Sequence, residues 1–407
     1  MGRGDDPLHL SVTVVIPAYN EEEGVRTCLE SVLRQTVAPD QVIVVDDGST
    51  DGTPLILEGF RGRVEVVTLV ENSGNKALAL GAALPHIRGD VVIHTDADSE
   101  LDLRAIELLL AHFLDPRVGA VSGIVVSRRH NILTSVRELQ YIMGQEVYKR
   151  GMGVLGTVMV IPGCVGAVRR DLFDPSPDTV TEDMDQTLTV MKAGHRVVYE
   201  PRAVALTSDP PNLHSYVRQS WRWFSGYFQN VRKHFSSLPR RMKFQMAYLS
   251  VENILGTVMP FFMVYLASAP RRGSLVMAFV LGEVASWLAI ALYGALRLRR
   301  IDLIPAALIS PVVRVIDGFL WTGTAVSELL LNRRDVTWRR ADRFRFASEA
   351  GELRGSEPGL AGGREKGVGG DGSGGRPRNA PPHLNEPLIG EPLQGGHDPV
   401  PVNVERV

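Results

Sequence analysis

The sequence predicts an α/β domain built on a sheet, followed by an apolar helical region. Two patterns support this. In the first half, short β-branched runs alternate with helix-like segments, which is typical of βαβ units whose sheet is covered by helices on both faces. In the second half, the apolar stretch 244–331 is long enough for membrane spans, each of which needs about 20 residues.

The composition indicates a tail at each end of the sequence and argues against nucleic-acid binding and a disulfide framework. Residues 1–9 form an expected N-terminal tail, and 348–407 are rich in Gly and Pro, as in disordered segments. The formal net charge of -2 gives no electrostatic case for nucleic acid as a partner. Cys28 and Cys164 are too few for a disulfide framework. No apolar signal-peptide core precedes the first strand, so the domain over 10–236 is expected in the cytosol.

The order of elements in the first half predicts where a ligand binds. Right-handed crossovers bring the carboxyl ends of parallel strands to one rim, and ligands bind beyond those ends. The expected strands cover 12–16, 41–45, 64–70 and a run ending at Asp96, and the expected helices cover 21–35, 54–60 and the residues after 76.

Polar side chains follow three of these strands. They are Tyr19 with Glu21, Asp46 with Asp47, and Asp96 with Asp98. Carboxylates there can accept hydrogen bonds from a ribose or a base, and the last pair suggests a divalent cation with a phosphorylated ligand. Lys76 offers a positive charge for phosphate. No G-x-G-x-x-G follows the first strand, so a nucleotide site without the dinucleotide helix is predicted. Plain acidic turns are the alternative.

Two features of the middle segment have both a structural and a functional interpretation. Pro162, Gly163 and Gly166 interrupt an apolar run, which indicates either a bulge or the close approach of a ligand. Thr181-Glu-Asp183 precedes a helix expected over 184–193. Thr181 could cap that helix, with acids complementing its dipole. A carboxylate held there could instead act as a general base.

The segment 213–235 is predicted to be a two-sided amphipathic helix. At about 100° per residue, one apolar stripe contains Leu213, Val217, Trp221, Phe224, Phe228, Val231 and Phe235. Gln219, Arg222 and Trp223 lie roughly opposite. Flanking basic residues suit a membrane interface, and a guanidinium on the second face could stabilise a leaving diphosphate. An ordinary surface helix is the alternative.

These motifs together carry a resemblance. Pro17-Ala-Tyr-Asn-Glu21, Asp46-Asp-Gly-Ser-Thr-Asp-Gly-Thr53, Asn72-Ser-Gly-Asn-Lys76 and Asp96-Ala-Asp98 resemble the GT-A domain of family 2 inverting glycosyltransferases. Thr181-Glu-Asp183 and Gln219-Ser-Trp-Arg-Trp223 are similar to the T-E-D and Q-x-x-R-W motifs of its processive branch, which includes hyaluronan, chitin, cellulose and poly-N-acetylglucosamine synthases. The resemblance implies a GT-A, Rossmann-like mixed sheet, then interfacial amphipathic helices and a C-terminal transmembrane helical region.

The resemblance also implies a role for each motif residue. Asp98 would bind Mg²⁺ or Mn²⁺, and Asp183 would be the catalytic base. Gln219, Arg222 and Trp223 would bind the diphosphate and the acceptor end, with Gly163 and Cys164 in an acceptor-lining loop. The nucleotide-sugar would contact Tyr19, Glu21, Asp46, Asp47, Lys76 and Asp96.

The implied protein is a multi-pass enzyme of the plasma membrane with a cytosolic catalytic domain. It would use a metal-bound UDP-sugar to extend a β-linked polysaccharide of the N-acetylglucosamine or glucose type. Transfer of one sugar to a lipid acceptor, and a non-catalytic membrane scaffold, are the alternatives. The chain would have only a few membrane helices, so those of two chains would need to pair to form a channel. A homo-oligomer is therefore an open alternative.

The number of membrane spans is ambiguous from the sequence. Spans are expected over 246–268 and 274–296, where Glu252 and Glu283 should face protein or a polar path. In 303–331, prolines and charged residues are expected to break the first part, leaving an interfacial segment before a third span. Length favours three spans. Two spans and a re-entrant piece would instead keep the arginines after 332 inside.

Overall fold

A computed structural model of the chain describes residues 10–269 and 272–333, so the predicted tails over 1–9 and 348–407 lie outside the described residues. The described part contains one eight-stranded sheet in the order β3-β2-β1-β4-β7-β6-β8-β5. The strands are β1 (Val12–Ala18), β2 (Gln41–Asp46), β3 (Glu65–Thr68), β4 (Val91–His94), β5 (Glu100–Leu101), β6 (Val118–Ser127), β7 (Gly166–Arg169) and β8 (Arg196–Thr207).

The sheet has a parallel part and a mixed part. Strands β3, β2, β1 and β4 are all parallel, which matches the predicted βαβ pattern. Strand β7 then runs antiparallel to both β4 and β6, and β6 pairs parallel with β8 across register shifts. The predicted mixed α/β sheet is confirmed. Its mixed part begins at β7, the first strand that runs antiparallel to its neighbours.

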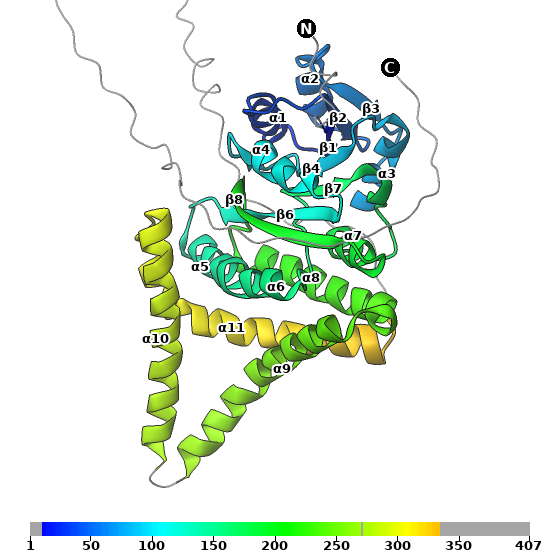
Figure 1. Ribbon diagram of the computed structural model, residues 1–407. Helices are drawn as coiled ribbons and strands as arrows, with labels where there is room; N and C mark the ends of the chain where they lie inside the picture. Colours follow the sequence, from blue (N-terminus) through cyan, green and yellow to red (C-terminus); the bar gives the residue numbers. More distant parts are fainter. Residues whose placement is uncertain (1–9, 270–271, 334–407) are drawn as a thin grey trace, which may run out of the picture.

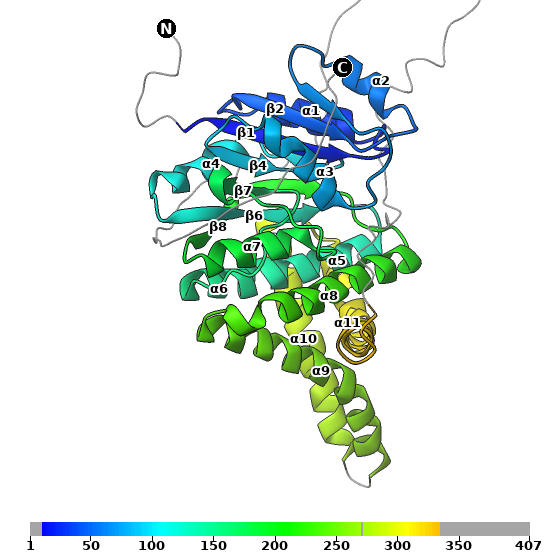
Figure 2. The same ribbon diagram turned by 90° about the vertical axis from the view of Figure 1, so that its right-hand side faces the viewer.

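Helices cover both faces of the sheet (Figures 1 and 2). Helices α1 (Val25–Leu33) and α4 (Ala105–Leu110) pack on one face with the alternate side chains of β1. Helices α3 (Lys76–Ala83) and α7 (Glu182–Lys192) pack on the other. A short helix, α2 (Thr53–Glu58), follows β2.

A second helical layer lies beneath this sandwich (Figure 2). It contains α5 (Ile132–Tyr141), the π-helix η4 (Ile142–Lys149), α6 (Arg150–Leu155) and α8 (Leu213–His234). The helical segment formed by α5, η4 and α6 therefore runs from Ile132 to Leu155 with a π-helical middle. In the apolar run that Pro162 interrupts, the only strand described is β7, because Pro162 lacks a backbone N–H and cannot donate to a sheet ladder.

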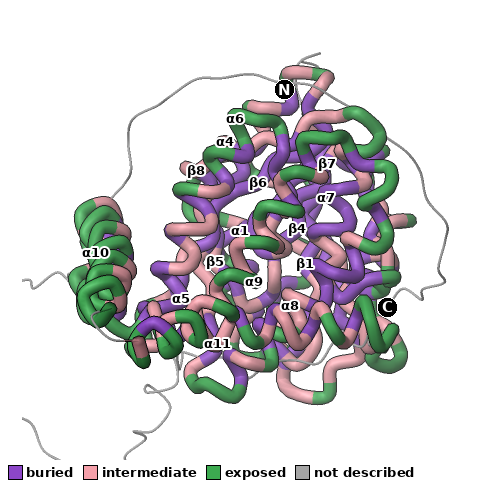
Figure 3. Tube along the Cα trace, turned by 90° about the horizontal axis from the view of Figure 1, so that it is seen from below, coloured by how far each residue is buried: buried purple, intermediate pink, exposed green. Residues whose placement is uncertain are grey.

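Three long apolar helices complete the described chain: α9 (Arg240–Ser268), α10 (Gly273–Leu298), and α11 (Leu303–Ala325) continued by the π-helix η7 (Val326–Leu330). By length and composition each could cross a membrane. Helices α9 and α10 form a hairpin that projects from the body, whereas α11 runs across its base (Figures 1 and 2). Seen from below, α10 stands at the edge with mostly exposed residues (Figure 3).

The predicted break in 303–331 is wrong, because α11 is one continuous helix. Pro305 lies in the first turn, where a missing N–H removes no intrahelical bond. Pro311 lies inside the helix, and its neighbours continue the helix on both sides. Asp317 accepts a hydrogen bond from the Tyr216 hydroxyl at 2.8 Å, so its polar side chain is satisfied without unwinding.

Candidate active site

A cleft with about 450 Å³ of empty space, part of it open to solvent, lies beyond the carboxyl ends of β1 and β4. Every residue predicted for the nucleotide-sugar or the metal lines it except Asp46. The lining residues are Pro17, Ala18, Tyr19, Glu21, Asp47, Lys76, Ala79, Asp96, Ala97 and Asp98. Asp46 is buried, and its Oδ1 accepts a hydrogen bond from the Ser49 N–H at 3.0 Å. Its position indicates a role in shaping the loop after β2.

Asp47 is held on the cavity wall by the loop after β3. Its Oδ1 accepts from the Ser73 N–H at 2.9 Å, and its Oδ2 accepts from the Ser73 hydroxyl at 2.9 Å. Burial raises the pKa of Asp47 above its ordinary value. The next residue, Gly48, has φ +71°, and a Cβ there would lie 2.6 Å from the Glu71 carbonyl carbon. Only glycine allows this close approach of the two loops.

Lys76 joins the cavity to the T-E-D segment. Its Nζ lies 2.6 Å from Asp96 Oδ1 and 3.0 Å from Glu182 Oε1. Burial disfavours the charged ammonium, but the two carboxylates outweigh it and raise the pKa of Lys76. A Cβ at Gly163 would lie only 2.5 Å from this Nζ. Four segments far apart in sequence therefore meet around one ammonium group.

The loop that contains Gly163 and Cys164 is tied to the end of β4. The Thr95 hydroxyl donates to the Cys164 carbonyl at 2.9 Å, and His94 Nδ1 lies 3.2 Å from the Gly163 carbonyl oxygen. Burial raises the pKa of the Cys164 thiol, so this side chain is neutral. Gly163 lies beside Lys76 and Asp96, two residues that line the cavity.

Asp183 lies in the first turn of α7, partly buried, next to Glu182. Its Oδ1 accepts from the Met184 N–H at 2.8 Å. Burial, followed by the nearby charge of Glu182, raises the pKa of Asp183 to about 6. The side chain is therefore ionised at neutral pH and more basic than an ordinary aspartate. These are the properties of a general base.

Thr181 occupies the N-cap position of α7, and Glu182 and Asp183 lie in the first turn, where acids complement the dipole, but the Thr181 side chain makes no capping hydrogen bond. Its hydroxyl instead accepts from Asn230 Nδ2 of α8 at 3.0 Å. A Cβ at Gly226, one turn earlier on α8, would overlap the Thr181 side chain. Gln229 Oε1 accepts from the Val180 N–H at 3.0 Å. The T-E-D segment is thus docked on α8.

The predicted acceptor residues continue the face of α8 that meets Thr181. Arg222 and Trp223 precede Gly226 by one turn, and Gln219 precedes it by two, so all share that side of the helix. Gln219 is buried, whereas Arg222 and Trp223 are partly exposed. The geometry brings the T-E-D and Q-x-x-R-W segments onto one helix face.

Arg137 of α5 is a site residue that sequence reasoning missed. Its guanidinium lies over the Trp223 ring at 4.8 Å and over the Tyr216 ring at 4.2 Å. Its Nη2 donates to Gln219 Oε1 at 2.9 Å. The neighbouring Tyr141 ring also approaches Trp223, with centroids 6.5 Å apart. The sequence did contain a signal for this role, because Arg137 stands among apolar residues on the buried side of a helix.

The oxygen donors in the cavity fit a magnesium or manganese ion. Asp96, Asp98 and Asp47 line the same space, and carboxylate oxygens are the ligands that hard cations prefer. Across residues 10–269 and 272–333, no three His, Cys, Asp or Glu side chains gather as a metal cage. A magnesium ion is usually held by one or two carboxylates and completed by substrate phosphates.

Residues 13–175 match the family described as glycosyl transferase family 2. Among the relatives of this chain, an N-acetylglucosaminyltransferase of Rhizobium meliloti (strain 1021) is 29% identical over 249 residues, covering 56% of this chain and 58% of the relative. A poly-beta-1,6-N-acetyl-D-glucosamine synthase of Staphylococcus aureus (strain COL) is 27% identical over 252 residues, covering 60% and 61%. The chain thus spans less than two thirds of either relative.

One solved structure shares the fold of this chain. It is the mannosyltransferase PcManGT from Pyrobaculum calidifontis in complex with GDP-Man and Mn²⁺, with a TM-score of 0.56 and 22% identity. The match covers 76% of this chain and 87% of that one. Together with the family match, it confirms the predicted resemblance and fold class.

Proposed function

We propose that this protein is a membrane-bound inverting glycosyltransferase that uses a metal-bound UDP-sugar to extend a β-linked polysaccharide of the N-acetylglucosamine or glucose type. The observation that carries the proposal is the meeting at Lys76. Asp96, which lines the donor cavity, has its Oδ1 2.6 Å from Lys76 Nζ. Glu182 of the T-E-D segment has its Oε1 3.0 Å from the same nitrogen. A donor and an acceptor could therefore react at one place.

The donor would bind in the cavity with its nucleoside near Tyr19 and Asp47 and its diphosphate near Lys76. Asp96 and Asp98 would hold the divalent cation, which would neutralise negative charge on the diphosphate. The ammonium of Lys76 supplies a further fixed positive charge in a partly closed site, where such charges act strongly.

Asp183 would take the proton of the acceptor hydroxyl. As that O–H bond breaks, the oxygen forms a bond to the anomeric carbon, and the bond from that carbon to the UDP oxygen breaks on the opposite face. Configuration is thereby inverted and UDP leaves as the anion. A pKa of about 6 suits this task, because the base is free at neutral pH and still has affinity for the proton.

The face of α8 would bind the acceptor and the departing diphosphate. Arg222 provides a guanidinium for phosphate oxygens, and the Trp223 ring provides an apolar surface for a sugar. Arg137 holds that ring from behind, and Gln219 is fixed by the same guanidinium. Binding the acceptor end on a helix that also holds the T-E-D segment would align its hydroxyl with Asp183.

The relatives favour N-acetylglucosamine as the transferred sugar, since both are named for its transfer or its polymer. The structure with the same fold contains a nucleotide-sugar and Mn²⁺, which supports the same class of donor and ion. The three apolar helices support a multi-pass location in the plasma membrane with the catalytic domain on the cytosolic side. A growing glycan would then be the acceptor at the membrane.

The test is UDP release by detergent-solubilised protein with Mg²⁺ or Mn²⁺, using single UDP-sugars and pairs, followed by sizing of the products. UDP-N-acetylglucosamine alone should give release and a long ladder. A ladder that needs two donors would indicate a copolymer, and a single added sugar on a lipid would indicate the non-processive alternative. No release with any donor would overturn the enzymatic proposal in favour of a scaffold.

A further inference from the structure

Glu328 is a buried acid in an apolar segment of the chain. It lies in the π-helix η7 and is only 4% exposed, and it is the only charged residue between Asp317 and Arg333. A buried carboxylate is costly unless hydrogen-bond donors surround it. Short π-helical segments also occur often at functional sites. Glu328 therefore needs specific donors on the surface that covers it.

Helix α8 supplies these donors. Gln229 Nε2 donates to Glu328 Oε1 at 2.9 Å. Arg232, about one turn further along α8, donates from Nη2 to the Glu328 backbone carbonyl at 2.8 Å and from Nη1 to Asn332 Oδ1 at 2.6 Å. The π-helix η7 is thus bonded to the part of α8 that follows the Q-x-x-R-W residues.

The same glutamine also binds the backbone that leads to the proposed base. Gln229 Oε1 accepts from the Val180 N–H at 3.0 Å, and both residues are buried. Val180 directly precedes the T-E-D segment and lies three residues before Asp183. One side-chain amide therefore joins Glu328 to the T-E-D segment through two hydrogen bonds, which together form the Gln229 bridge.

The chemistry of the three groups allows the Gln229 bridge in one orientation only. A carboxylate offers only acceptors, and a backbone N–H is only a donor. The amide of Gln229 offers both, so its NH₂ must face Glu328 and its oxygen must face Val180. The carboxylate thus fixes the direction of the amide. Without it, the amide could turn and leave the buried Val180 N–H without its acceptor, which is unfavourable.

The first turn of α7 depends on such contacts from outside the helix. Thr181, at its N-cap position, makes no capping hydrogen bond. Asn230 Nδ2 of α8 instead holds the Thr181 hydroxyl at 3.0 Å, and the Gln229 bridge holds the backbone one residue earlier. A shift of Val180 would therefore change where α7 begins and where Asp183 points.

We infer that Glu328 is a positioning residue for sugar transfer. It orients Gln229, which holds the backbone of Val180 and thereby aims Asp183 at the acceptor hydroxyl. This role rests on the proposed function, because Asp183 is the base only in that reaction. Glu328 acts through the Gln229 bridge and does not itself touch the substrate. The catalytic rate thereby depends on how η7 is docked on α8.

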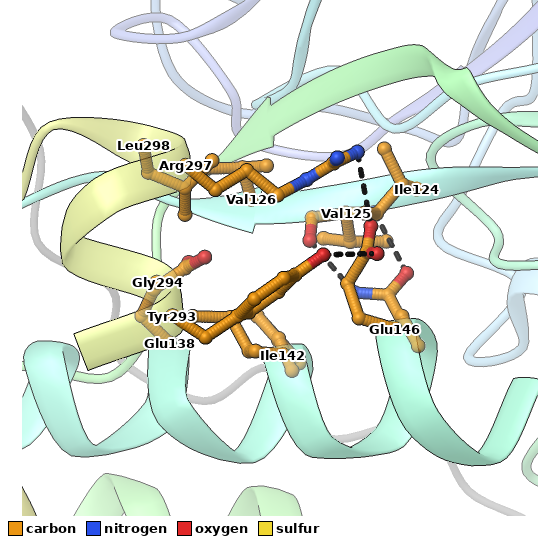
Figure 4. A pocket seen from close by; sticks show the side chains of 12 residues that line it. Ile124, Val125, Val126, Glu138, Ile142, Glu146, Tyr293, Gly294, Arg297 and Leu298 are labelled. Atoms are coloured by element: carbon orange, nitrogen blue, oxygen red, sulfur yellow. Dashed lines mark hydrogen bonds and ion pairs between the residues drawn. The ribbon is translucent and has the colours of Figure 1, made fainter. Parts of the chain in front are cut away.

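The end of α10 is docked on the domain without such a link to the base. The Tyr293 hydroxyl donates to Glu146 Oε2 at 2.9 Å, and Arg297 Nη2 lies 3.3 Å from Glu146 Oε1. These side chains surround a small cavity between β6, the π-helix η4 and α10 (Figure 4). Among the hydrogen bonds described, Glu146 has none to the T-E-D segment. Tyr293 therefore separates the docking of an apolar helix from the positioning of the base.

Steady-state UDP release by the detergent-solubilised full chain tests the inference. Glu328→Met removes the carboxylate at similar size, and kcat should fall about tenfold while donor KM and UDP affinity stay within about twofold of the parent, since small misplacements of a catalytic group are costly. Tyr293→Phe loses a docking bond elsewhere and should keep the parent kcat. An unchanged kcat in Glu328→Met, or an equal fall in Tyr293→Phe, would overturn the inference.

A local control lies at the same end of the chain as Glu328. Asn332→Gly removes the bond to Arg232 and leaves the Gln229 bridge in place. Glycine suits this position, where Asn332 has φ +51°. The variant should keep the parent kcat. A loss as large as that of Glu328→Met would mean that docking of η7 alone matters, and would contradict the role of the bridge.

An exchange of the two side chains provides a rescue test. Gln229→Glu alone places a second carboxylate where Gln229 donated to Glu328, so kcat should fall about tenfold or more. With Glu328→Gln added, the carboxylate at 229 accepts from both the Val180 N–H and the amide at 328, so kcat should return to within about threefold of the parent. A double variant that binds UDP normally but does not recover would contradict the Gln229 bridge.

Amide hydrogen exchange, measured by mass spectrometry on the full chain in detergent, tests the bridge without turnover. The Val180 N–H should exchange about tenfold faster in Glu328→Met than in the parent, and at the parent rate in Tyr293→Phe. Equal exchange in all three proteins would overturn the bridge. A parent that releases no UDP from any UDP-sugar would refute the proposed function, and the positioning role with it. An active parent whose kcat is matched by Glu328→Met would refute the positioning role alone.

Discussion

The two halves of the candidate site are held in place by different parts of the structure. The donor half, formed by the ends of β1, β2 and β4 with Lys76, is positioned by the backbone ladder of parallel strands and by turns. The acceptor half, formed by the T-E-D segment and α8, is positioned by side chains from distant elements, such as Asn230 on Thr181 and Arg137 on Trp223. The acceptor half should therefore be more sensitive to substitutions outside the chemistry.

The largest effect is expected at Asp183, the proposed base of the acceptor half. Asp183→Asn should lower sugar transfer by about 10²- to 10⁴-fold, the range for loss of a general base. UDP binding, measured by calorimetry, should stay unchanged because the donor half is intact. Asp171→Asn, at an exposed acid of the same domain, is the control and should keep full activity. Retained transfer in Asp183→Asn would refute the base assignment.

Lys76 is where the two halves meet, so its loss should impair both. Lys76→Met removes the ammonium and leaves Asp96 and Glu182 without their shared cation. We expect a loss of about 10² in kcat/KM, the scale for one electrostatic group at a transition state, with weaker UDP-sugar binding. Lys243→Met, whose Nζ contacts only the Ser236 carbonyl among the hydrogen bonds described, is the control. Unaltered donor affinity would place Lys76 outside the donor half.

Gly226 tests the acceptor half by itself, because the atoms nearest to a Cβ there all belong to Thr181. Gly226→Ala would drive a methyl group into Thr181 and displace the T-E-D segment. A roughly tenfold fall in kcat with unchanged UDP affinity is expected, since small misplacements of a catalytic group are costly. Gly151→Ala on α6, where a Cβ meets nothing within 4 Å, is the matched control and should be neutral or slightly stabilising. Equal behaviour of the two variants would contradict docking through Gly226.

The pH dependence should also distinguish the halves. The raised pKa of Asp183, about 6, means that the base becomes protonated as the pH falls through 6, so kcat should drop about tenfold per pH unit below that value. Above pH 7 the base is ionised and this dependence disappears. UDP binding measured over the same range should not follow this curve. A kcat that is flat down to pH 5 would exclude Asp183 as the titrating base.

The same difference explains what the sequence could predict. Strand-end residues such as Tyr19, Asp47 and Asp96 are readable because the chain order alone brings parallel strand ends to one rim. The alternation of strands and helices along the chain is therefore enough to predict that these residues meet in one cavity. The family resemblance and the α/β class were confirmed, and the roles assigned to individual residues stay predictions.

Contacts across distant elements were beyond sequence reasoning. Thr181 looked like a helix cap because its local sequence permits one, and only the packing of Gly226 shows that its hydroxyl faces α8. Asp317 looked like a helix breaker, since its partners on the catalytic domain, Tyr216 and Gln140, lie about a hundred residues or more away. Local propensity yields to tertiary contacts in both places.

The smallest expected effect is at Arg137, which touches the acceptor half only from behind. Arg137→Lys keeps the positive charge near Asp209, 3.9 Å away, but loses the planar group stacked on Trp223 and Tyr216. Such stacking is worth about 0.5–1 kcal/mol at a partly exposed ring, so acceptor KM should rise about two- to fivefold. The UDP affinity and the pH profile should stay as in the parent, which a general loss of folding would not allow. Arg61→Lys, at an exposed arginine, is the control. An unchanged acceptor KM would mean that Trp223 does not bind the acceptor or does not need this support.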